Sequence, residues 1–325
     1  MYRILVKPLF LLCVGLSCVT HSIANEEYPT RPVKILDGYS PGGGTDYLAR
    51  YLAAKTGPDF GATVVVENRQ GASGQIAMST VAKSKPDGYT LMAIPNELWS
   101  VAPLLYKNLP FNAERELVPI ATLAEVPLVL TANPKVATKT PQELIAFAKA
   151  NPDKLTFGSA GAGTTHHLAA ELFKSMAKIE MVHVPYKGTS AAVSDLLAGQ
   201  IDLVFSPITA VLPHIKSGKL KALAVAGKKR VAALPDTPTI AEAGLPGYES
   251  GVWVILVGPA QTPNHVIDKW ITQTRKVFST DDARAALAVQ GVEPLHMSQE
   301  EIRQRNRDDM ERWRKVIGDA KISIE

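Results

Sequence analysis

The sequence predicts an α/β protein of two lobes that are joined by two crossover strands. Short apolar runs alternate with helical patterns along most of the 325 residues, as expected for strands and helices of parallel or mixed sheets. Two glycine-rich loops, at 37–46 and 158–167, each follow an apolar run and precede a helical stripe. A third stretch, 117–132, is apolar and long enough to leave one lobe and enter the other.

The first lobe is expected to use two separate parts of the chain, 25–125 and 227–325. Apolar and β-branched runs predict its strands, and apolar residues spaced three and four apart predict its helices. The expected strands are at 33–36, 63–67, 89–94 and 253–257, and the expected helices are around 48–53 and at 75–84, 239–243, 262–278, 281–289 and 298–317.

The second lobe is expected at 126–226. Thr140 before Pro141 is a strong signal for a helix start, because it supplies an N-cap and a residue preset for the first turn. The expected strands are at 155–157, 181–186, 201–205 and 220–226, and the expected helices are at 141–151, 168–176, 190–198 and 210–217. The strand at 220–226 would return the chain to the first lobe. Two crossing strands then form a hinge, and such clefts usually close on a small ligand.

The N-terminus predicts a signal peptide at 1–24. Basic residues precede an apolar run at 8–19, and Ser22-Ile23-Ala24 fits cleavage after Ala24. Cys13 and Cys18 both lie in this segment, so the mature chain has no disulfide and no cysteine metal ligand. Lipidation at Cys18 is the alternative. The net charge of +4 is too small and too evenly spread to indicate nucleic-acid binding.

The two glycine-rich loops predict an anion clamp. Glycines let backbone approach a ligand closely, and a helix N-terminus offers unpaired N–H groups with a partial positive charge. Such a site needs no Lys or Arg. The loops share Gly-x-Gly-Thr and then Leu-Ala-x-x-Leu, about 120 residues apart. The candidate ligand-binding residues are Tyr39, Ser40, Gly43, Gly44, Thr45 and Asp46 in the first loop, and Ser159, Ala160, Gly161, Gly163, Thr164 and His166 in the second.

Catalytic and cofactor sites are not expected. The second loop has the glycine spacing of a P-loop, but Thr164 stands where that motif needs Lys, and both loops lack the third glycine of a dinucleotide site. His167 and Glu171 are four residues apart, but two ligands do not make a metal site. An exported hydrolase that uses Ser159 with a nearby histidine is an alternative, although no Gly-x-Ser-x-Gly motif supports it.

Several ordered motifs carry a resemblance to a known family. They are at 28–33, 41–46, 64–69, 86–91, 158–161, 183–188, 218–220, 234–239, 242–244 and 258–263. With them the chain resembles the substrate-binding proteins of tripartite tricarboxylate transporters, the Bug family. The resemblance implies a periplasmic binding protein of the Venus-flytrap, type II-like form. It also implies that the two loops grip a small organic carboxylate largely through backbone N–H groups, hydroxyls and water, for delivery to membrane transporter subunits.

The identity of the carboxylate is expected to depend on Asn96, Tyr186 and Ser206. Family members often have an acid or amide after the strand that ends here at Phe205, and its absence argues against an amino-acid ligand. Glu97 is unusual for the family. If it faces the cleft, it would repel a second carboxylate or accept a hydrogen bond from a hydroxyl or a protonated nitrogen.

The expected partners are therefore the carboxylate and the transporter, without nucleic acid or cofactor, and we expect a monomer. A receptor subunit that signals to a membrane sensor is the second alternative. It would have the same fold.

Overall fold

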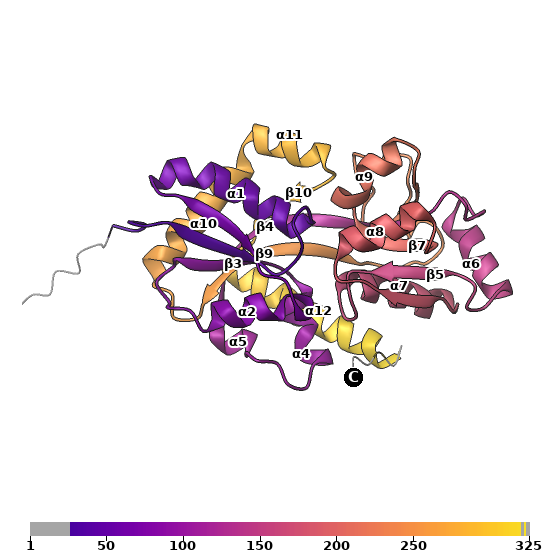
Figure 1. The fold of residues 1–325 in the computed structure, drawn as a ribbon, viewed down its shortest axis with the longest axis horizontal. Coiled ribbons are helices and arrows are strands. Elements are labelled where there is room, and N and C mark those ends of the chain that lie inside the picture. The colour runs from indigo at the N-terminus through magenta and orange to yellow at the C-terminus, as the bar shows by residue number, and fades with distance from the viewer. Residues whose placement is uncertain (1–26, 320–321, 323–325) are drawn as a thin grey trace, which may run out of the picture.

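A computed structural model of the chain describes residues 27–319 and 322, and the predicted signal peptide lies outside the described residues. Figure 1 shows two lobes side by side, with strands β4 (Leu117–Ala132) and β9 (Gly251–Pro259) running through the junction. The strand order is β2-β1-β3-β9-β4-β7-β5-β6, and β8 and β10 also pair with β4.

The first lobe holds the parallel strands β2, β1 and β3 and the antiparallel β9, which in turn pairs with the first part of β4. One face of this half-sheet is covered by α1 and α10, and the other by α2, α3, α5 and α12. The remaining bounds are β1 Val33–Asp37, α1 Gly44–Phe60, β2 Val64–Asn68, η1 Ala72–Gly74, α2 Gln75–Ala82, β3 Thr90–Pro95, α3 Glu97–Ser100, α4 Ala102–Leu105, α5 Ala113–Glu116, α10 Asn264–Ser279, α11 Asp281–Val289, β10 Glu293–Pro294 and α12 Gln299–Asp319.

The second lobe holds β8 and β7, which pair with the last part of β4, and the parallel strands β7, β5 and β6. Helices α6 and α7 cover one face, and α8 and α9 cover the other. The bounds are α6 Pro141–Ala150, β5 Thr156–Ser159, α7 Thr165–Ala177, β6 Val182–Pro185, α8 Thr189–Ala198, β7 Leu203–Pro207, α9 Ile208–Lys216 and β8 Lys221–Val225.

Strand β4 is the first connection between the lobes. It pairs with β9 up to Pro127 and with β7 from Leu128 onward. The second connection is longer than expected, because β8 pairs with β4 inside the second lobe and the chain crosses only between residues 226 and 251. Tyr248 still donates a hydrogen bond to the carbonyl of Ala169, at 2.8 Å. The lobe limits at 125/126 and 226/227 stay a prediction.

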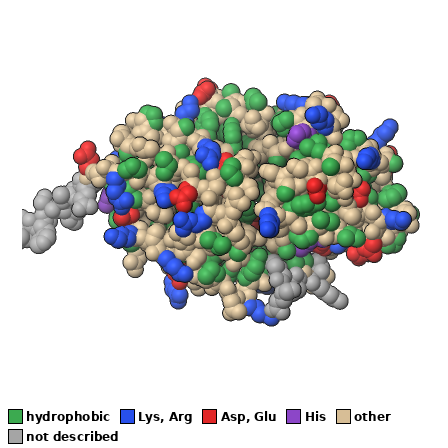
Figure 2. All heavy atoms as spheres, in the orientation of Figure 1, with side chains coloured by type: hydrophobic (Ala, Val, Ile, Leu, Met, Phe, Trp, Pro, Cys, Tyr) green, Lys and Arg blue, Asp and Glu red, His purple; other side chains and the backbone are tan. Residues whose placement is uncertain are grey.

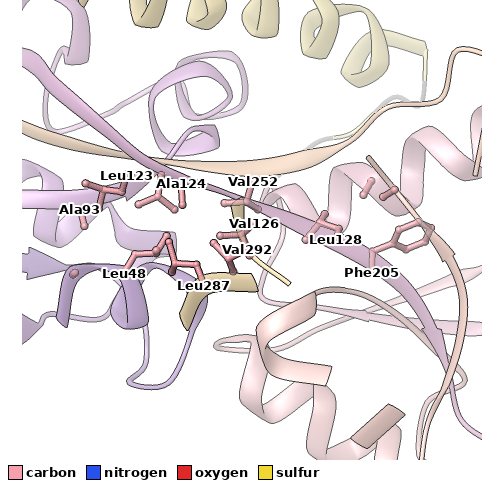
Figure 3. Packing of buried hydrophobic residues seen from close by; sticks show 14 of the residues in the cluster. Leu48, Ala93, Leu123, Ala124, Val126, Leu128, Phe205, Val252, Leu287 and Val292 are labelled. Atoms are coloured by element: carbon pink, nitrogen blue, oxygen red, sulfur yellow. The ribbon is translucent and has the colours of Figure 1, made fainter. Parts of the chain in front are cut away.

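The apolar core continues from one lobe to the other along β4. Figure 3 shows Leu123, Val126 and Leu128 in one row, with Leu48 of the first lobe and Phe205 of the second among their neighbours. All of these side chains are buried, so the junction is packed rather than solvated. Helix α12 adds a second contact, because its Trp313 belongs to the same apolar cluster as Leu168 of α7.

Two local expectations differ from the structure. Three short helices, α3 to α5, fill the stretch between β3 and β4 for which the sequence pattern predicts no element. The expected helix at 239–243 is only a turn. Thr239 and Glu242 form the reciprocal hydrogen bonds of a capping box, but Gly244 and Pro246 follow before a second turn can form.

Among the described residues on the face drawn in Figure 2, basic side chains do not gather on one lobe. Figure 2 shows Lys and Arg side chains spread over both lobes on the face in view. Within the described part of the chain, no helix is long and apolar enough to cross a membrane. Nor do the described residues contain three or more His, Cys, Asp or Glu side chains grouped to hold a metal ion.

Candidate functional site

The front cleft is formed by two adjoining cavities between the lobes. The larger one has a volume of about 40 Å³. It is lined by Tyr39, Ser40, Gly43, Gly44, Thr45, Pro95, Glu97, Val126, His166, Thr189, Ser190, Pro207 and Val252. The smaller one is lined by Tyr39, Ser73, Gln75, Glu97, Leu98, Ala102, Tyr106, Gly163 and Thr164. Tyr39 and Glu97 belong to both.

Three helix starts from opposite lobes meet at the front cleft. Helix α1 begins after Gly43, α7 after Thr164 and α8 after Gly188, and none of these three N-caps makes a side-chain capping hydrogen bond. The backbone N–H groups of a first helical turn have no partner within the helix, and the helix dipole makes this end partly positive. The cleft therefore offers hydrogen-bond donors and a positive potential without a basic side chain.

Two glycines allow the lobes to approach closely at the cleft. A Cβ atom at Gly188 would lie 3.1 Å from Oγ of Ser40 on the opposite lobe, and one at Gly161 would lie 3.4 Å from Oγ of Ser73. Both glycines have positive φ, which other residues rarely adopt. A side chain at Gly188 would therefore meet steric crowding and backbone strain together.

A polar network supports the first glycine loop from below. Asp37 is fully buried at the end of β1 and accepts hydrogen bonds from Thr45 Oγ1 and Asn68 Nδ2, at 3.1 Å each. Burial, aided by the nearby Asp46, raises the pKa of Asp37 to about 7. Asp46 itself is fully paired, because it binds Arg50, Asn68 and the N–H of Gly42. The predicted role of Asp46 as a ligand contact therefore competes with its role in holding the loop.

The wall formed by Glu97 and His166 differs from this network, because several of its buried polar atoms have no hydrogen-bond partner in the described part of the chain. Glu97 Oε2 and both ring nitrogens of His166 lack a hydrogen-bond partner within the described residues. Their side chains are nevertheless buried, with 5% and 7% of the residue surface exposed. Burial raises the pKa of Glu97, and it lowers the pKa of His166 to about 4, so the imidazole is neutral at neutral pH. Buried polar groups normally have partners, so these atoms are open to a ligand.

Comparison with known proteins identifies the family. The sequence model described as "Tripartite tricarboxylate transporter family receptor" matches residues 48–322. The chain belongs to this family. It is 34% identical to the protein BugT of Bordetella pertussis over 316 residues, which cover 94% of this chain and 96% of BugT.

Solved structures of similar proteins agree with the two-lobed fold. Rpa4515 of R. palustris, solved with adipate, is 33% identical with a TM-score of 0.88, and the match covers 91% of this chain and 99% of that one. The periplasmic binding protein BugD is 34% identical with a TM-score of 0.84, covering 91% and 99%. The chain is thus a Bug-family member with the α/β fold of periplasmic binding proteins, and its family is one of periplasmic solute-binding receptors.

The structure of this Bug-family chain brings most predicted residues to the front cleft. Tyr39, Ser40, Gly43, Gly44, Thr45 and His166 line the larger cavity, and Gly163 and Thr164 line the smaller one. The neighbouring Ala160 and Gly161 complete the second loop, which the Thr164 hydroxyl closes by donating to the carbonyl of Gly161, at 2.7 Å. Ser206 is fully buried with an unpaired hydroxyl, next to the cavity residue Pro207.

Three predicted residues have other partners. Ser159 Oγ lies 2.7 Å from His183 Nε2, a base that the sequence pattern does not indicate. Burial lowers the pKa of His183 to about 4, and Ser159 is not among the residues that line either cavity. Tyr186 donates its hydroxyl to Asp195, at 2.7 Å. Asn96 faces away from the cleft and is described with the back groove below.

Sequence analysis missed two kinds of cleft residue, namely valines on the strands at the lobe junction and hydroxyl residues at the start of α8. Val126 and Val252 line the front cleft, while their neighbours Glu125, Pro127, Gly251 and Trp253 line a groove on the opposite face. Side chains alternate between the faces of a strand, so the crossover strands separate two sites. Thr189 and Ser190 follow Gly188, which could have been recognised as a third glycine before a helix.

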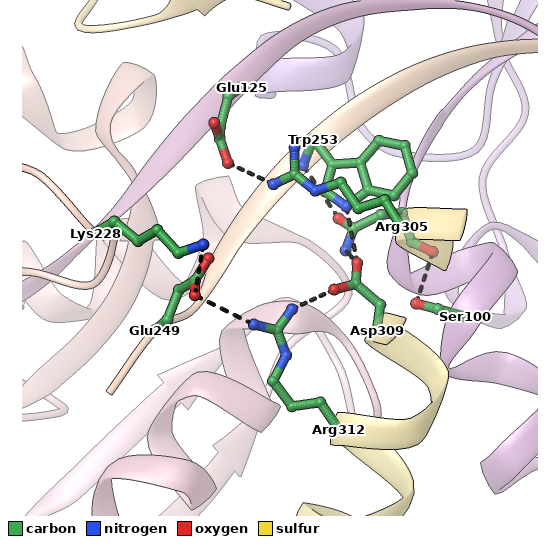
Figure 4. Close-up of polar contacts among 9 residues, drawn as sticks. Ser100, Glu125, Lys228, Glu249, Trp253, Arg305, Asp309 and Arg312 are labelled. Carbon is green, nitrogen blue, oxygen red and sulfur yellow. Dashed lines mark hydrogen bonds and ion pairs between the residues drawn. The ribbon is translucent and has the colours of Figure 1, made fainter. Parts of the chain in front are cut away.

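The back groove, shown in Figure 4, contains ion pairs between α12 and the crossover segments. Asp309 is buried and accepts hydrogen bonds from Trp253 Nε1 at 2.9 Å and Asn96 Nδ2 at 3.1 Å, and it pairs with Arg312. Arg312 also lies 3.6 Å from Glu249, which pairs with Lys228 at 3.3 Å. A separate pair joins Arg305 to Glu125 at 2.7 Å.

Proposed function

We propose that this chain captures a small organic carboxylate in the front cleft and delivers it to a tripartite membrane transporter. The carboxylate is held mainly by backbone N–H groups at the starts of α1, α7 and α8. The observation that carries the proposal is the convergence of these three uncapped helix starts on one interlobe cavity. Hydroxyl groups of Thr189 and Ser190 line the same cavity and add further donors.

Membership of this family supports a carboxylate as the ligand. Adipate, the compound named with Rpa4515, is a carboxylate, and that structure shares the fold of this chain. Helix starts bind such anions because N–H groups and the helix dipole act together. The description of the family as a transporter receptor supports delivery to a transporter. In this function the chain changes no covalent bond, so it needs no catalytic group.

Replacement of Gly43 tests the binding mode. Gly43 lines the cavity with an ordinary φ of −76°, and an added Cβ would come no closer than 3.6 Å to its neighbours. Gly43→Ala should therefore fold normally and add bulk to the wall. We expect a screen of mono- and dicarboxylates by thermal shift to find a stabilising ligand. Titration calorimetry should then show at least about fivefold weaker binding by Gly43→Ala, since one misplaced methyl group costs about 1–3 kcal/mol.

Gly318→Ala is the matched control, because Gly318 lies in α12 with no atom near its Cβ position. It should bind like the parent. A screen in which no carboxylate raises the melting temperature would contradict the proposed function. Equal affinity of Gly43→Ala and the parent would contradict the binding mode.

A further inference from the structure

We propose that the ligand of the front cleft carries a protonated nitrogen as well as a carboxylate, and that Glu97 binds this nitrogen. The inference rests on the proposed function, because it assumes that the carboxylate binds at the helix starts. It adds a class of ligand, amino carboxylates, and a residue that selects it.

The backbone at the end of β3 fixes the direction in which Glu97 points. Pro95 and Glu97 line the front cleft, whereas Asn96 between them faces the back groove. Both ends of the Asn96 amide are used, because Nδ2 donates to Asp309 and Oδ1 accepts from the backbone N–H of Trp253 at 3.1 Å. This anchoring holds Glu97 in the cleft wall.

One oxygen of the buried Glu97 carboxylate is left without a hydrogen-bond partner among the described residues. Its Oε2 has no hydrogen-bond partner in the described part of the chain, and the residue is 5% exposed. Burial is the main cause that raises the pKa of Glu97, and the negative charge of Asp309 adds to it, while hydrogen bonding to the hydroxyl and N–H of Thr165 and to the N–H of Glu97 itself opposes it. An ionised carboxylate buried without a partner is costly, so a cation that enters the cleft is stabilised by Glu97.

The protein itself supplies no such cation. Among the described residues that line the two cavities, none is Lys or Arg. His166 is the remaining basic side chain of this wall, and burial lowers its pKa to about 4, so it is neutral at neutral pH. The positive group that pairs with Glu97 therefore has to come from the ligand.

Two regions of the front cleft have opposite electrostatic character. Gly43, Gly44 and Thr189 belong to the larger cavity, where the positive ends of α1 and α8 meet. Glu97 lies where the larger and the smaller cavity join. A ligand with a carboxylate and a protonated nitrogen matches both regions, whereas a dicarboxylate would place its second charge beside Glu97.

The test is a ligand series measured by thermal shift and titration calorimetry. The standard amino acids and 4-aminobutanoate are compared with analogues in which hydroxyl, hydrogen or carboxylate replaces the amino group. We expect at least one amino carboxylate to bind roughly tenfold to a hundredfold more tightly than its analogues, the range for a charge-assisted hydrogen bond. If an analogue without nitrogen binds as tightly as every amino carboxylate, the inference is overturned while the proposed function stands. If no carboxylate of any class binds, the proposed function fails as well.

Variants of Glu97 test whether this side chain binds the protonated nitrogen. Glu97→Gln should lose at least about tenfold in affinity for the amino carboxylate but not for the dicarboxylate analogue, because only the charge pair is removed. Glu97→Asp keeps the charge and should retain part of the preference. Glu114→Gln removes an exposed acid from α5 and serves as the control. An unchanged preference in a folded Glu97→Gln variant, checked by its melting curve, would overturn the assignment.

Discussion

The front cleft and the back groove lie on opposite faces of the same crossover strands, and they differ in whether their charged and polar side chains have partners. In the back groove, Asp309, Glu249 and Glu125 each have a basic partner on the chain. In the front cleft, Glu97 and His166 have none among the described residues, and three helix starts are uncapped. Paired charges hold a junction together, whereas unpaired buried groups lower stability and favour a ligand.

This difference indicates a structural role for the back groove and supports the proposed binding role of the front cleft. The back groove is the larger opening, yet its acids Asp309, Glu249 and Glu125 are paired with basic side chains. The front cleft is smaller, but Glu97 Oε2 and the ring nitrogens of His166 have no partner among the described residues. Size alone would favour the back groove, whereas the pairing of polar groups favours the front cleft.

The largest effect is expected from breaking the pairing in the back groove. Asp309→Ala leaves Trp253 Nε1 and Asn96 Nδ2 without their acceptor and Arg312 without its nearest acid. We expect the free energy of unfolding to fall by about 4 kcal/mol, as for other buried charge networks that lose one member. Urea denaturation measures it. Asp308→Ala removes an exposed neighbour and should change it by less than about 0.5 kcal/mol. A loss below about 1 kcal/mol for Asp309→Ala would mean that the network contributes little.

The architecture was largely predictable because strand and helix signals are local. The run at 117–132 is confirmed as one strand that serves both lobes, and the start of α6 at Pro141 is confirmed with its Thr140 cap. The stretch that became α3 to α5 has helices of only four residues, too short to show a period of 3.6. The late second crossing was missed because β8 looks the same in sequence whichever lobe it pairs with.

The candidate site could be predicted where it depends on glycines and hydroxyl residues close together in the sequence. It could not be predicted where it depends on contacts between distant parts of the chain. Glycines and hydroxyls at the two loops indicated an anion site, and many of them line the front cleft. The partners of Asn96 come from β9 and α12, about 150 and 210 residues further along the chain, so no local pattern could reveal them. For the same reason the sequence around Ser159 does not reveal its contact with His183, which lies opposite Phe157 in the pairing of β5 and β6.

A smaller effect is expected from the acid beneath the front cleft, and it depends on pH. The pKa of Asp37 is raised from 3.8 to about 7, so the folded state holds its proton at pH values where the unfolded chain has released it. Its contribution to stability is therefore present at low pH and is lost as the pH rises through about 7.

In Asp37→Asn this loss is absent. Relative to the parent, the free energy of unfolding of the variant should rise by about 2.5 kcal/mol between pH 5 and pH 8. The Thr45 hydroxyl can reverse its hydrogen bond to accept from the new amide. Urea denaturation at several pH values measures the difference, with the exposed Asp268→Asn as control. A difference that does not change with pH would show that Asp37 is ionised throughout this range.

The smallest effect compares two adjacent histidines at the start of α7. His166 has both ring nitrogens unpaired, whereas His167 accepts from the N–H of Gly163 at 3.2 Å and stacks on His183 with ring centres 4.0 Å apart. His166→Met should leave the free energy of unfolding unchanged or raise it by up to about 1 kcal/mol, because it removes buried polar atoms that have no partner. His167→Met should lower it by about 1–2 kcal/mol, because it leaves the Gly163 donor unpaired and loses a ring contact. Urea denaturation of both variants without ligand provides the comparison. If His166→Met is the more destabilised of the two, the imidazole of His166 supports the fold, and the contrast between the front cleft and the back groove does not extend to this wall.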